Sequence, residues 1–356
     1  MAGDEKKKST DFSPPAISLC ATAFRSLRMR ILILNNAAIE KLLGMPACID
    51  EMEAALASLA REQAHNPLRM VVRPPNAKGL LGLMPAYMKD DQTFFGLKAI
   101  GVFHQNQLVG KDSHQGIVCL FDGETGEPLA IMNASAITAI RTAAVSAVAT
   151  KVLARQDASD LAIIGSGVQA SSHLAAMNLV RTLKRVRVAS RKVENAKKFA
   201  ARNAAHYSFP IEAVSNTEEA IRDADIIVTA TSSQQPITRR EWIAGGAHIN
   251  AIGASIATAR EIDAATVADS KLFVDRRESA VNEAGEYLLA LRDGVIEPSH
   301  IVAEVGEILI GEKSGRTAAD EITLFKSVGL AVEGLASARY LYDRAVELNE
   351  GSWVEF

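Results

Sequence analysis

Residues 161–170, with the sequence Leu-Ala-Ile-Ile-Gly-Ser-Gly-Val-Gln-Ala, limit the fold more than any other part of the chain. A short apolar run breaks at Gly165 and Gly167, and a helical pattern follows. In such a strand–turn–helix the first glycine permits the tight turn, the second lets a pyrophosphate approach the backbone, and the small Ala170 lets the helix pack closely on the strand. The phosphates then lie at the N–H groups of the first helical turn. The segment therefore predicts a dinucleotide-binding unit.

Later runs of the chain predict the rest of a parallel sheet. Residues 224–231 and 248–253 are almost wholly apolar and end in small residues, as parallel strands do when both faces are buried and a ligand lies across their carboxyl ends. Residues 271–275 predict one more strand, and helical patterns lie between the runs, at Glu194–Arg202 and Thr217–Arg222. The alternation predicts an α/β fold with a doubly wound, Rossmann-type nucleotide-binding domain.

The strand predicted over residues 185–191 bears on the choice of coenzyme. It ends where a Rossmann domain meets the adenosine ribose, and a domain that prefers NAD usually has Asp or Glu there. This chain has Ser190, Arg191 and Lys192 instead. A hydroxyl followed by two cations suits a 2′-phosphate, so we expect NADPH. The alternative is that both cations are solvated charges at the start of a helix, which leaves NADH open.

The composition limits which binding partners and which kinds of site we expect. The 39 Lys and Arg residues and 42 Asp and Glu residues leave a net charge of −3 without a basic block, so we expect no nucleic-acid partner. No apolar run approaches the length of a membrane span, so we expect no membrane partner. The 3 cysteines and 7 histidines are dispersed, which predicts no disulfide framework, no metal site and a reducing, cytoplasmic location. The length of 356 residues suits two domains.

The first 28 residues differ from the rest of the chain. Residues 1–10 are charged and polar, and Pro14 and Pro15 interrupt any helix. We therefore expect residues 1–28 to be a disordered extension, with a targeting peptide as the minor alternative.

Residues 29–133 have a mixed α+β pattern. Apolar residues recur at helical spacing over residues 49–64. Strand-like runs occupy residues 30–34, 70–72, 94–103, 116–122 and 128–132, and the turn at residues 122–126 predicts that the last two form a hairpin. A second domain with its own sheet therefore precedes the nucleotide unit.

A helix predicted over residues 137–154 carries Arg141 and Thr142 near its start. An arginine in the first turn opposes the helix dipole unless an anion lies beside it. A guanidinium and a helix N-terminus together make a clamp for a carboxylate or a phosphate. The alternative is an arginine that extends to solvent.

Seven motifs together resemble the ornithine cyclodeaminase/mu-crystallin family of NAD(P)-dependent imine-forming and imine-reducing enzymes. The motifs occur in the family's order and lie at residues 82–87, 96–98, 114–116, 140–144, 165–170, 251–255 and 324–330. The resemblance implies a homodimer. It also implies that residues 29–145 and 315–356 form a substrate-binding and dimerisation domain, with the nucleotide domain at residues 146–314. In this arrangement a C-terminal helical stretch over residues 321–348 brings Ser327, Val328 and Gly329 to the coenzyme cleft.

The resemblance also implies which residues bind the substrate. Arg69, Lys98 and Arg141 match the positions that hold the α-carboxylate and the α-nitrogen, and Val328 is a further expected substrate-binding residue. An arginine supplies a permanently charged fork for a carboxylate, and a desolvated lysine can exchange a proton with nitrogen, so Lys98 is the expected catalytic residue. The alternative for Lys98 is the outer face of an edge strand. The residues expected to contact the coenzyme are Arg141, Gly165, Gly167, Val168, Gln169, Ser190, Arg191, Thr231, Asn250, Ala251, Ile252 and Ser327.

One departure from the family pattern separates two activities. Cyclodeaminases of the family carry an aspartate in a Gly-Gly-Asp loop after the fifth strand, where this chain has Ser255, as the mu-crystallin-like reductases do. A serine hydroxyl alone is a poor general base, which disfavours ornithine cyclodeamination. Glu261 and Asp263 are nearby acids that could take that place instead.

These observations predict an NAD(P)H-dependent reductase of small cyclic ketimine carboxylates, such as 1-pyrroline-2-carboxylate or 1-piperideine-2-carboxylate, that yields cyclic L-amino acids. Three alternatives stay open. They are an ornithine cyclodeaminase, a dehydrogenase of alanine or N-substituted amino acids, and a non-catalytic NADPH-binding protein of the crystallin type.

Overall fold

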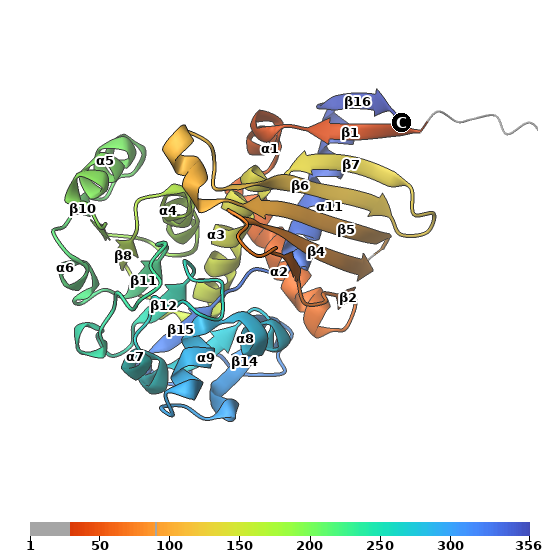
Figure 1. The fold of residues 1–356 in the computed structure, drawn as a ribbon. Helices are drawn as coiled ribbons and strands as arrows, with labels where there is room; N and C mark the ends of the chain where they lie inside the picture. Colours follow the sequence, from red (N-terminus) through yellow and green to blue (C-terminus); the bar gives the residue numbers. More distant parts are fainter. Residues whose placement is uncertain (1–28, 90) are drawn as a thin grey trace, which may run out of the picture.

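The computed structural model describes residues 29–89 and 91–356, which form two sheets with helices packed between and around them (Figure 1). The expected disordered extension, residues 1–28, lies outside the described residues. The helix α3 (Ala134–Leu153) packs against strands of both sheets and so joins the two halves of the molecule.

The first sheet has eight strands in the order β16-β1-β7-β6-β5-β4-β2, with β3 paired to β4. Its strands are β1 (Arg30–Leu34), β2 (Ala64–His65), β3 (Met70–Val72), β4 (Leu80–Lys89), β5 (Thr93–Val102), β6 (His114–Asp122), β7 (Pro128–Asn133) and β16 (Ser352–Glu355). All neighbours are antiparallel except β1 and β7. The pairing of β1 with β16 places the two ends of the described chain side by side, as Figure 1 shows.

One face of this sheet is covered chiefly by α3 and α11 (Ala331–Leu348), and α2 (Met45–Ala60) packs on these two helices. Alternate residues of β4, among them Met84, Ala86 and Met88, point to this face and are buried. Helix α11 lies directly on β5 at Gly96, where a Cβ atom would come within 2.9 Å of the Leu335 Cδ1 atom. The close fit brings residues of α11 next to those of β5.

The opposite face of the first sheet is also apolar. Leu81, Phe95 and Ile117 point outward from three adjacent strands and are 43%, 48% and 41% exposed. Strands with one wet face normally alternate apolar and polar residues. This face departs from that pattern, so it has the composition of a surface that another protein surface covers.

The second sheet has eight parallel strands in the order β10-β9-β8-β11-β12-β15-β13-β14. They are β8 (Asp160–Ile164), β9 (Arg185–Ala189), β10 (Ile211–Ala213), β11 (Ile226–Thr229), β12 (His248–Ala251), β13 (Lys271–Val274), β14 (Ile301–Glu304) and β15 (Thr323–Lys326). The remaining helices are α1 (Asn36–Leu42), α4 (Val168–Val180), α5 (Val193–Asn203), α6 (Thr217–Ile221), α7 (Ala264–Asp269), α8 (Arg277–Glu283), α9 (Gly285–Arg292) and α10 (Val305–Leu309). The strand order and parallel pairing confirm the predicted Rossmann-type α/β fold.

The predicted helical stretch over residues 321–348 is wrong at its start. Residues 323–326 form β15, which lies between β12 and β13, and α11 begins only at Ala331. A strand that is buried on both faces has no alternating pattern, so its apolar run cannot be told from a buried helix. As a result, the expected domain boundary at residue 315 assigns a strand of the nucleotide-binding sheet to the other domain.

Two expectations about α3 are also wrong. Asn133 caps the helix by accepting hydrogen bonds from the N–H groups of Ser135 and Ala136, so the helix begins before residue 137 and Arg141 lies beyond its first turn. The dipole argument for an anion at Arg141 therefore does not hold.

The expectation that no apolar run approaches the length of a membrane span is also wrong for α3. This helix is long and apolar enough to cross a membrane by length and composition. However, 67% of its apolar stretch is buried inside the protein, as in the core helix of a folded domain.

Candidate active site

The three predicted substrate-binding cations lie together between the two sheets. Lys98 points from β5 toward the helices, Arg141 lies on α3, and Arg69 lies just before β3. The charges of both arginines act on the Lys98 ammonium group. The alternative that Lys98 occupies an edge strand is wrong, because β5 pairs with β4 and β6 and Lys98 is 6% exposed.

The Lys98 ammonium group is held in surroundings that disfavour its charge. Burial lowers the pKa of Lys98 well below its ordinary value of 10.5, Arg141 and Arg69 lower it further, and Glu333 opposes them. The Nζ atom donates to the Thr138 hydroxyl on α3 at 2.8 Å. Within the described chain this is its one hydrogen bond, so N–H groups remain for a ligand. A lysine with a lowered pKa gives up its proton more readily than an exposed lysine does.

Two glutamates that the sequence analysis did not anticipate face the arginines. Glu333 on α11 pairs with Arg141, and both side chains are buried. Glu283 at the end of α8 pairs with Arg69 at 2.8 Å. Burial raises the pKa of both glutamates, and the arginine partners lower it. We call these five residues, Arg69, Lys98, Arg141, Glu283 and Glu333, the cleft cluster.

The segment that follows β15 is fixed against the cleft cluster from two sides. The Asp275 carboxylate accepts hydrogen bonds from the Ser327 hydroxyl at 3.0 Å, the Val328 N–H at 2.9 Å and the Gly329 N–H at 3.0 Å. Arg69 donates to the carbonyl oxygens of Val328 and Gly329 at 2.7 and 3.0 Å. The segment that contains Ser327 and Val328 is therefore held beside Arg69 of the cleft cluster.

Gly329 also has a steric role beside Arg141. Its φ is +77°, and a Cβ atom would lie 2.8 Å from the Arg141 Nη1 atom. A side chain here would displace the guanidinium group. A small pocket adjoins this point, lined by Asn66, Pro67, Arg69, Met84, Ser279, Glu283, Gly329 and Ala331.

The glycine turn has the geometry that a pyrophosphate requires. Gly165 has φ of +127°, and a Cβ atom there would lie 2.5 Å from the Ala230 carbonyl oxygen. Gly167 is the N-cap of α4, no side chain caps the helix, and a Cβ atom at Gly167 would meet nothing within 4 Å. The first N–H groups of α4 are thus open to an anion, so the residues present fit a dinucleotide.

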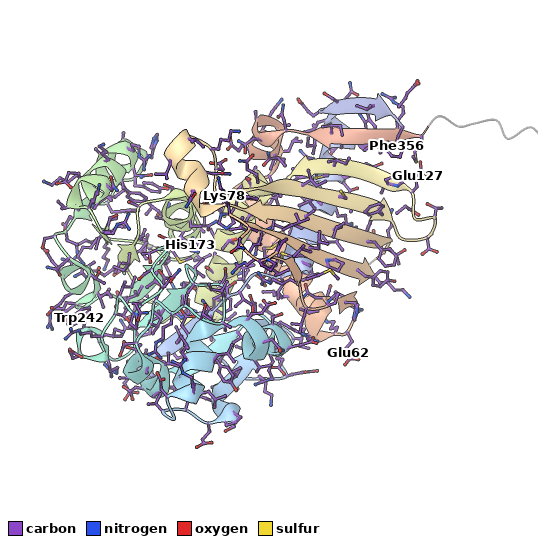
Figure 2. The ribbon with its side chains drawn as sticks, in the orientation of Figure 1. Glu62, Lys78, Glu127, His173, Trp242 and Phe356 are labelled. Atoms are coloured by element: carbon purple, nitrogen blue, oxygen red, sulfur yellow. The ribbon has the colours of Figure 1, made fainter. Side chains whose placement is uncertain are left out.

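Helix α4 connects this turn with Lys98. Val168 begins the helix and is 66% exposed. The Gln169 amide donates to the Thr138 carbonyl oxygen at 3.4 Å, and the hydroxyl of the same threonine accepts from Lys98. The helix continues inward to the buried His173, whose ring lies 2.9 Å from the Ser146 hydroxyl of α3; Figure 2 labels this histidine near the centre of the molecule. Thr138 therefore links the predicted phosphate site to the predicted catalytic lysine.

Residues at the ends of the neighbouring strands lie where the sequence analysis placed them, with one difference. Ser190 follows β9, and its hydroxyl lies 3.0 Å from that of Ser166, while Arg191 is exposed beside it. Thr231, Ala251 and Ile252 lie at or just beyond the carboxyl ends of β11 and β12. By contrast, the Asn250 side chain is buried and donates to the Thr150 hydroxyl of α3 at 3.0 Å, so it points away from this edge.

The nearby acids are already engaged in hydrogen bonds with backbone N–H groups. Ser255 is exposed in the loop after β12. Glu261 is buried and accepts from the Thr231 N–H at 2.7 Å, and Asp263 caps α7 by accepting from the Thr266 N–H at 3.2 Å. These structural hydrogen bonds argue against either acid as the general base of a cyclodeaminase. Among the described residues, no group of three or more His, Cys, Asp and Glu side chains is arranged to hold a metal ion.

Comparison with known proteins agrees with this architecture. Residues 29–349 match the model of the ornithine cyclodeaminase/mu-crystallin family. The Delta(1)-pyrroline-2-carboxylate reductase of Bacillus cereus is 38% identical over 327 residues, which cover 92% of this chain and 100% of that protein.

Two solved structures share the whole fold. The Delta(1)-pyrroline-2-carboxylate reductase of Thermococcus litoralis, in complex with NADH and L-proline, superposes with a TM-score of 0.88 at 39% identity and covers 90% of this chain and 99% of its own. An archaeal alanine dehydrogenase dimer with bound NAD has a TM-score of 0.87 at 34% identity and covers 92% and 100%. The resemblance inferred from the motifs is confirmed, and this chain belongs to the ornithine cyclodeaminase/mu-crystallin family.

Proposed function

We propose that this protein uses a nicotinamide coenzyme to reduce small cyclic ketimine carboxylates, such as 1-pyrroline-2-carboxylate or 1-piperideine-2-carboxylate, to cyclic L-amino acids. The observation that carries the proposal is the convergence of Arg69, Lys98 and Arg141 beside the helix that begins at the glycine turn. The Bacillus and Thermococcus relatives, both named Delta(1)-pyrroline-2-carboxylate reductase, support it.

Each cation has a separate task in this reaction. Arg69 and Arg141 hold the substrate carboxylate, and Val328 packs beside it, which fixes the C=N bond in one orientation. Reduction adds a hydride to the carbon and a proton to the nitrogen of that bond. A bound reduced nicotinamide would supply the hydride. Lys98, as an ammonium group, supplies the proton and becomes a neutral amine.

The low pKa of Lys98 serves this step. Without a ligand, burial and the two arginines favour the neutral amine. A substrate carboxylate near the three cations favours the charged form, because an opposite charge within a few ångströms raises the pKa of a lysine. Substrate binding therefore promotes protonation of Lys98. Transfer of that proton to nitrogen returns the lysine to the state that burial favours.

We propose that the coenzyme binds along the carboxyl edge of the second sheet. The backbone at Gly165, Gly167 and Val168 would receive the pyrophosphate, and Ser190 and Arg191 a 2′-phosphate, which makes NADPH the preferred coenzyme. Further contacts would come from Arg141, Gln169, Thr231, Ala251, Ile252 and Ser327, whereas the Asn250 side chain does not reach the edge. The two solved relatives hold NADH and NAD, so the choice in this chain depends on Ser190 and Arg191.

The ratio of KM values for NADH and NADPH tests the coenzyme assignment. The unaltered protein should have the lower KM for NADPH. Arg191→Ala should raise the KM for NADPH by about tenfold and leave that for NADH unchanged, because one charge-assisted contact to phosphate is lost. Arg202→Ala, in the last turn of α5, the helix that follows Arg191, is the matched control. A preference of the unaltered protein for NADH would contradict the assignment.

We also propose a homodimer in which a second copy covers the apolar outer face of the first sheet. Phe95 and Ile117 lie on that face, and the alanine dehydrogenase relative is a dimer. Light scattering should give the mass of two chains, and Phe95→Asp with Ile117→Asp should give one. A monomeric unaltered protein would contradict this arrangement.

A cytoplasmic location is part of the proposal. Two of the three cysteines, Cys48 and Cys119, belong to the described residues, and both are free thiols. Free thiols are usual in a reducing compartment.

Coenzyme oxidation across a panel of imino acids tests the activity. We expect turnover with 1-pyrroline-2-carboxylate and 1-piperideine-2-carboxylate, with proline and pipecolate as products. Faster turnover with pyruvate and ammonia would favour an amino-acid dehydrogenase instead. Release of ammonia from ornithine would favour a cyclodeaminase, and coenzyme binding without any oxidation would favour a non-catalytic protein.

A further inference from the structure

A lysine and two glutamates are buried beneath the carboxyl edge of the second sheet. Lys326 is the last residue of β15, Glu286 lies on α9, and Glu261 lies in the loop between β12 and α7. All three are 0% exposed. Burial of charged groups is strongly unfavourable unless each one is paired and fully hydrogen-bonded. We call these residues the edge network.

Lys326 connects the loop after β12 with α9. Its Nζ atom lies 3.0 Å from a Glu286 carboxylate oxygen, and it donates to the carbonyl oxygens of Ala251 and Ala254. The ammonium group therefore donates two hydrogen bonds to backbone carbonyl oxygens and forms an ion pair with the Glu286 carboxylate. The position of the loop therefore depends on Lys326.

Glu286 and Glu261 extend the network to the loop after β11. The second Glu286 oxygen accepts from the Glu261 N–H at 3.0 Å. One Glu261 oxygen accepts from the N–H and the hydroxyl of Thr231 at 2.7 and 2.6 Å, and the other accepts from the Gly253 N–H at 2.7 Å. A Cβ atom at Gly253 would lie 2.6 Å from both oxygens, so the carboxylate lies directly against the backbone.

The loops held in this way lie at one end of the proposed coenzyme site. The glycine turn after β8 takes the pyrophosphate, and the end of β9 takes the adenosine ribose. The nicotinamide half must then extend in the other direction, over β11, β12 and β15. These are the strands whose following segments the edge network connects.

We propose that Lys326, Glu286 and Glu261 are positioning residues for the nicotinamide end of the coenzyme. They contact neither coenzyme nor substrate, and act by fixing the backbone at Thr231, Ala251 and the segment after Lys326. The inference rests on the proposed nicotinamide coenzyme and does not depend on which imine is reduced. The adenosine end, which lies at β8 and β9, should not depend on the edge network.

The test replaces the buried ion pair by apolar side chains of similar length. Removal of Lys326 alone leaves Glu286 uncompensated, whereas the double variant Lys326→Met/Glu286→Met removes both charges and should fold. We expect the double variant to bind NADPH about tenfold or more weakly, measured by coenzyme fluorescence, because the loops lose the ammonium donors. It should bind 2′-phospho-ADP-ribose, which lacks the nicotinamide, as tightly as the unaltered protein. For an NADH-preferring protein the probes are NADH and ADP-ribose.

Lys271→Met is the matched control, since it makes the same replacement at the amino end of the adjacent strand β13 and breaks a partly exposed pair with Glu321. It should leave the affinity for both probes unchanged. Unchanged NADPH affinity in the double variant would overturn the proposal, because the edge network would then serve folding alone. An equal loss of affinity for both probes would also overturn it, because the whole nucleotide site would then be distorted. Both readouts measure binding, so absence of imine reduction would refute the proposed function without affecting this test.

Discussion

Two lysines, both almost fully buried, differ in what surrounds them. In the cleft cluster, Lys98 has one hydrogen bond within the described residues and two arginines that disfavour its charge. In the edge network, Lys326 forms an ion pair with a carboxylate and donates to two carbonyl oxygens. An ammonium group that is paired with a carboxylate and bound to backbone oxygens holds a structure in place, whereas one with free N–H groups and no carboxylate partner can bind a ligand and transfer a proton. The same residue type thus supports the fold in one region and is available for chemistry in the other.

We expect the largest effect from Lys326→Met, which should lower the stability of the protein. The change leaves Glu286 buried without its cation, which should lower the free energy of unfolding by about 3–5 kcal/mol. Denaturant unfolding, followed by circular dichroism, measures this. Lys271→Met, which breaks a partly exposed pair, should cost about 1 kcal/mol or less. If the two variants were equally stable, the edge network would not be the fixed region that the comparison requires.

Lys98→Met should have the opposite profile. We expect kcat to fall by about 100-fold or more, because a positioned proton donor is lost. Since burial lowers the pKa of Lys98, the lysine opposes folding at pH values below 10.5, so the variant should unfold at an equal or higher temperature. Lys89→Met, at the exposed end of the neighbouring strand β4, is the control. Lower stability with unchanged kcat would reverse the roles of the two lysines.

Arg69→Gln should act on substrate binding. Loss of one of the two guanidinium groups should raise the KM for 1-pyrroline-2-carboxylate by about 10- to 50-fold, with a smaller change in kcat. Steady-state kinetics at saturating coenzyme measures both constants. Arg73→Gln replaces an exposed arginine four residues later and should change neither. An unchanged KM in Arg69→Gln would remove Arg69 from the substrate site.

The smallest expected effect is a shift in pH dependence. Lys98 must be protonated to donate, so kcat/KM should fall as the pH rises through its pKa, which lies below 10.5. Glu333 raises the pKa of Lys98, so Glu333→Gln should move this fall to lower pH by about one unit. Glu283→Gln, which neutralises the partner of Arg69, should move it less. A shift to higher pH in Glu333→Gln would contradict the electrostatics of the cleft cluster.

Local sequence signals predicted the parts of the molecule that depend on neighbouring residues. The glycine turn was predictable because Gly165 needs a positive φ and Gly167 leaves space at a helix start. Lys98 was predicted from the resemblance, in the motif at residues 96–98. The structure places this side chain on the covered face of the first sheet, beside both arginines.

Features that depend on distant residues were not predictable in the same way. In the sequence, Glu283 and Glu333 look like ordinary charged residues of helices. Their pairing with Arg69 and Arg141 depends on the fold. The edge network joins residues from three separate segments, so no local pattern reveals it. Strand β15 was missed because all four of its residues are buried, which removes the alternation that marks a strand.

The most direct test of the central claim compares two substrates that differ in one group. 1-Pyrroline has the same ring and C=N bond as 1-pyrroline-2-carboxylate but lacks the carboxylate that Arg69 and Arg141 are proposed to hold. The unaltered protein should show kcat/KM at least about 1000-fold higher for the carboxylate, because both the charge contacts and the orientation that they impose are lost with 1-pyrroline. Equal kcat/KM for the two compounds would contradict the account.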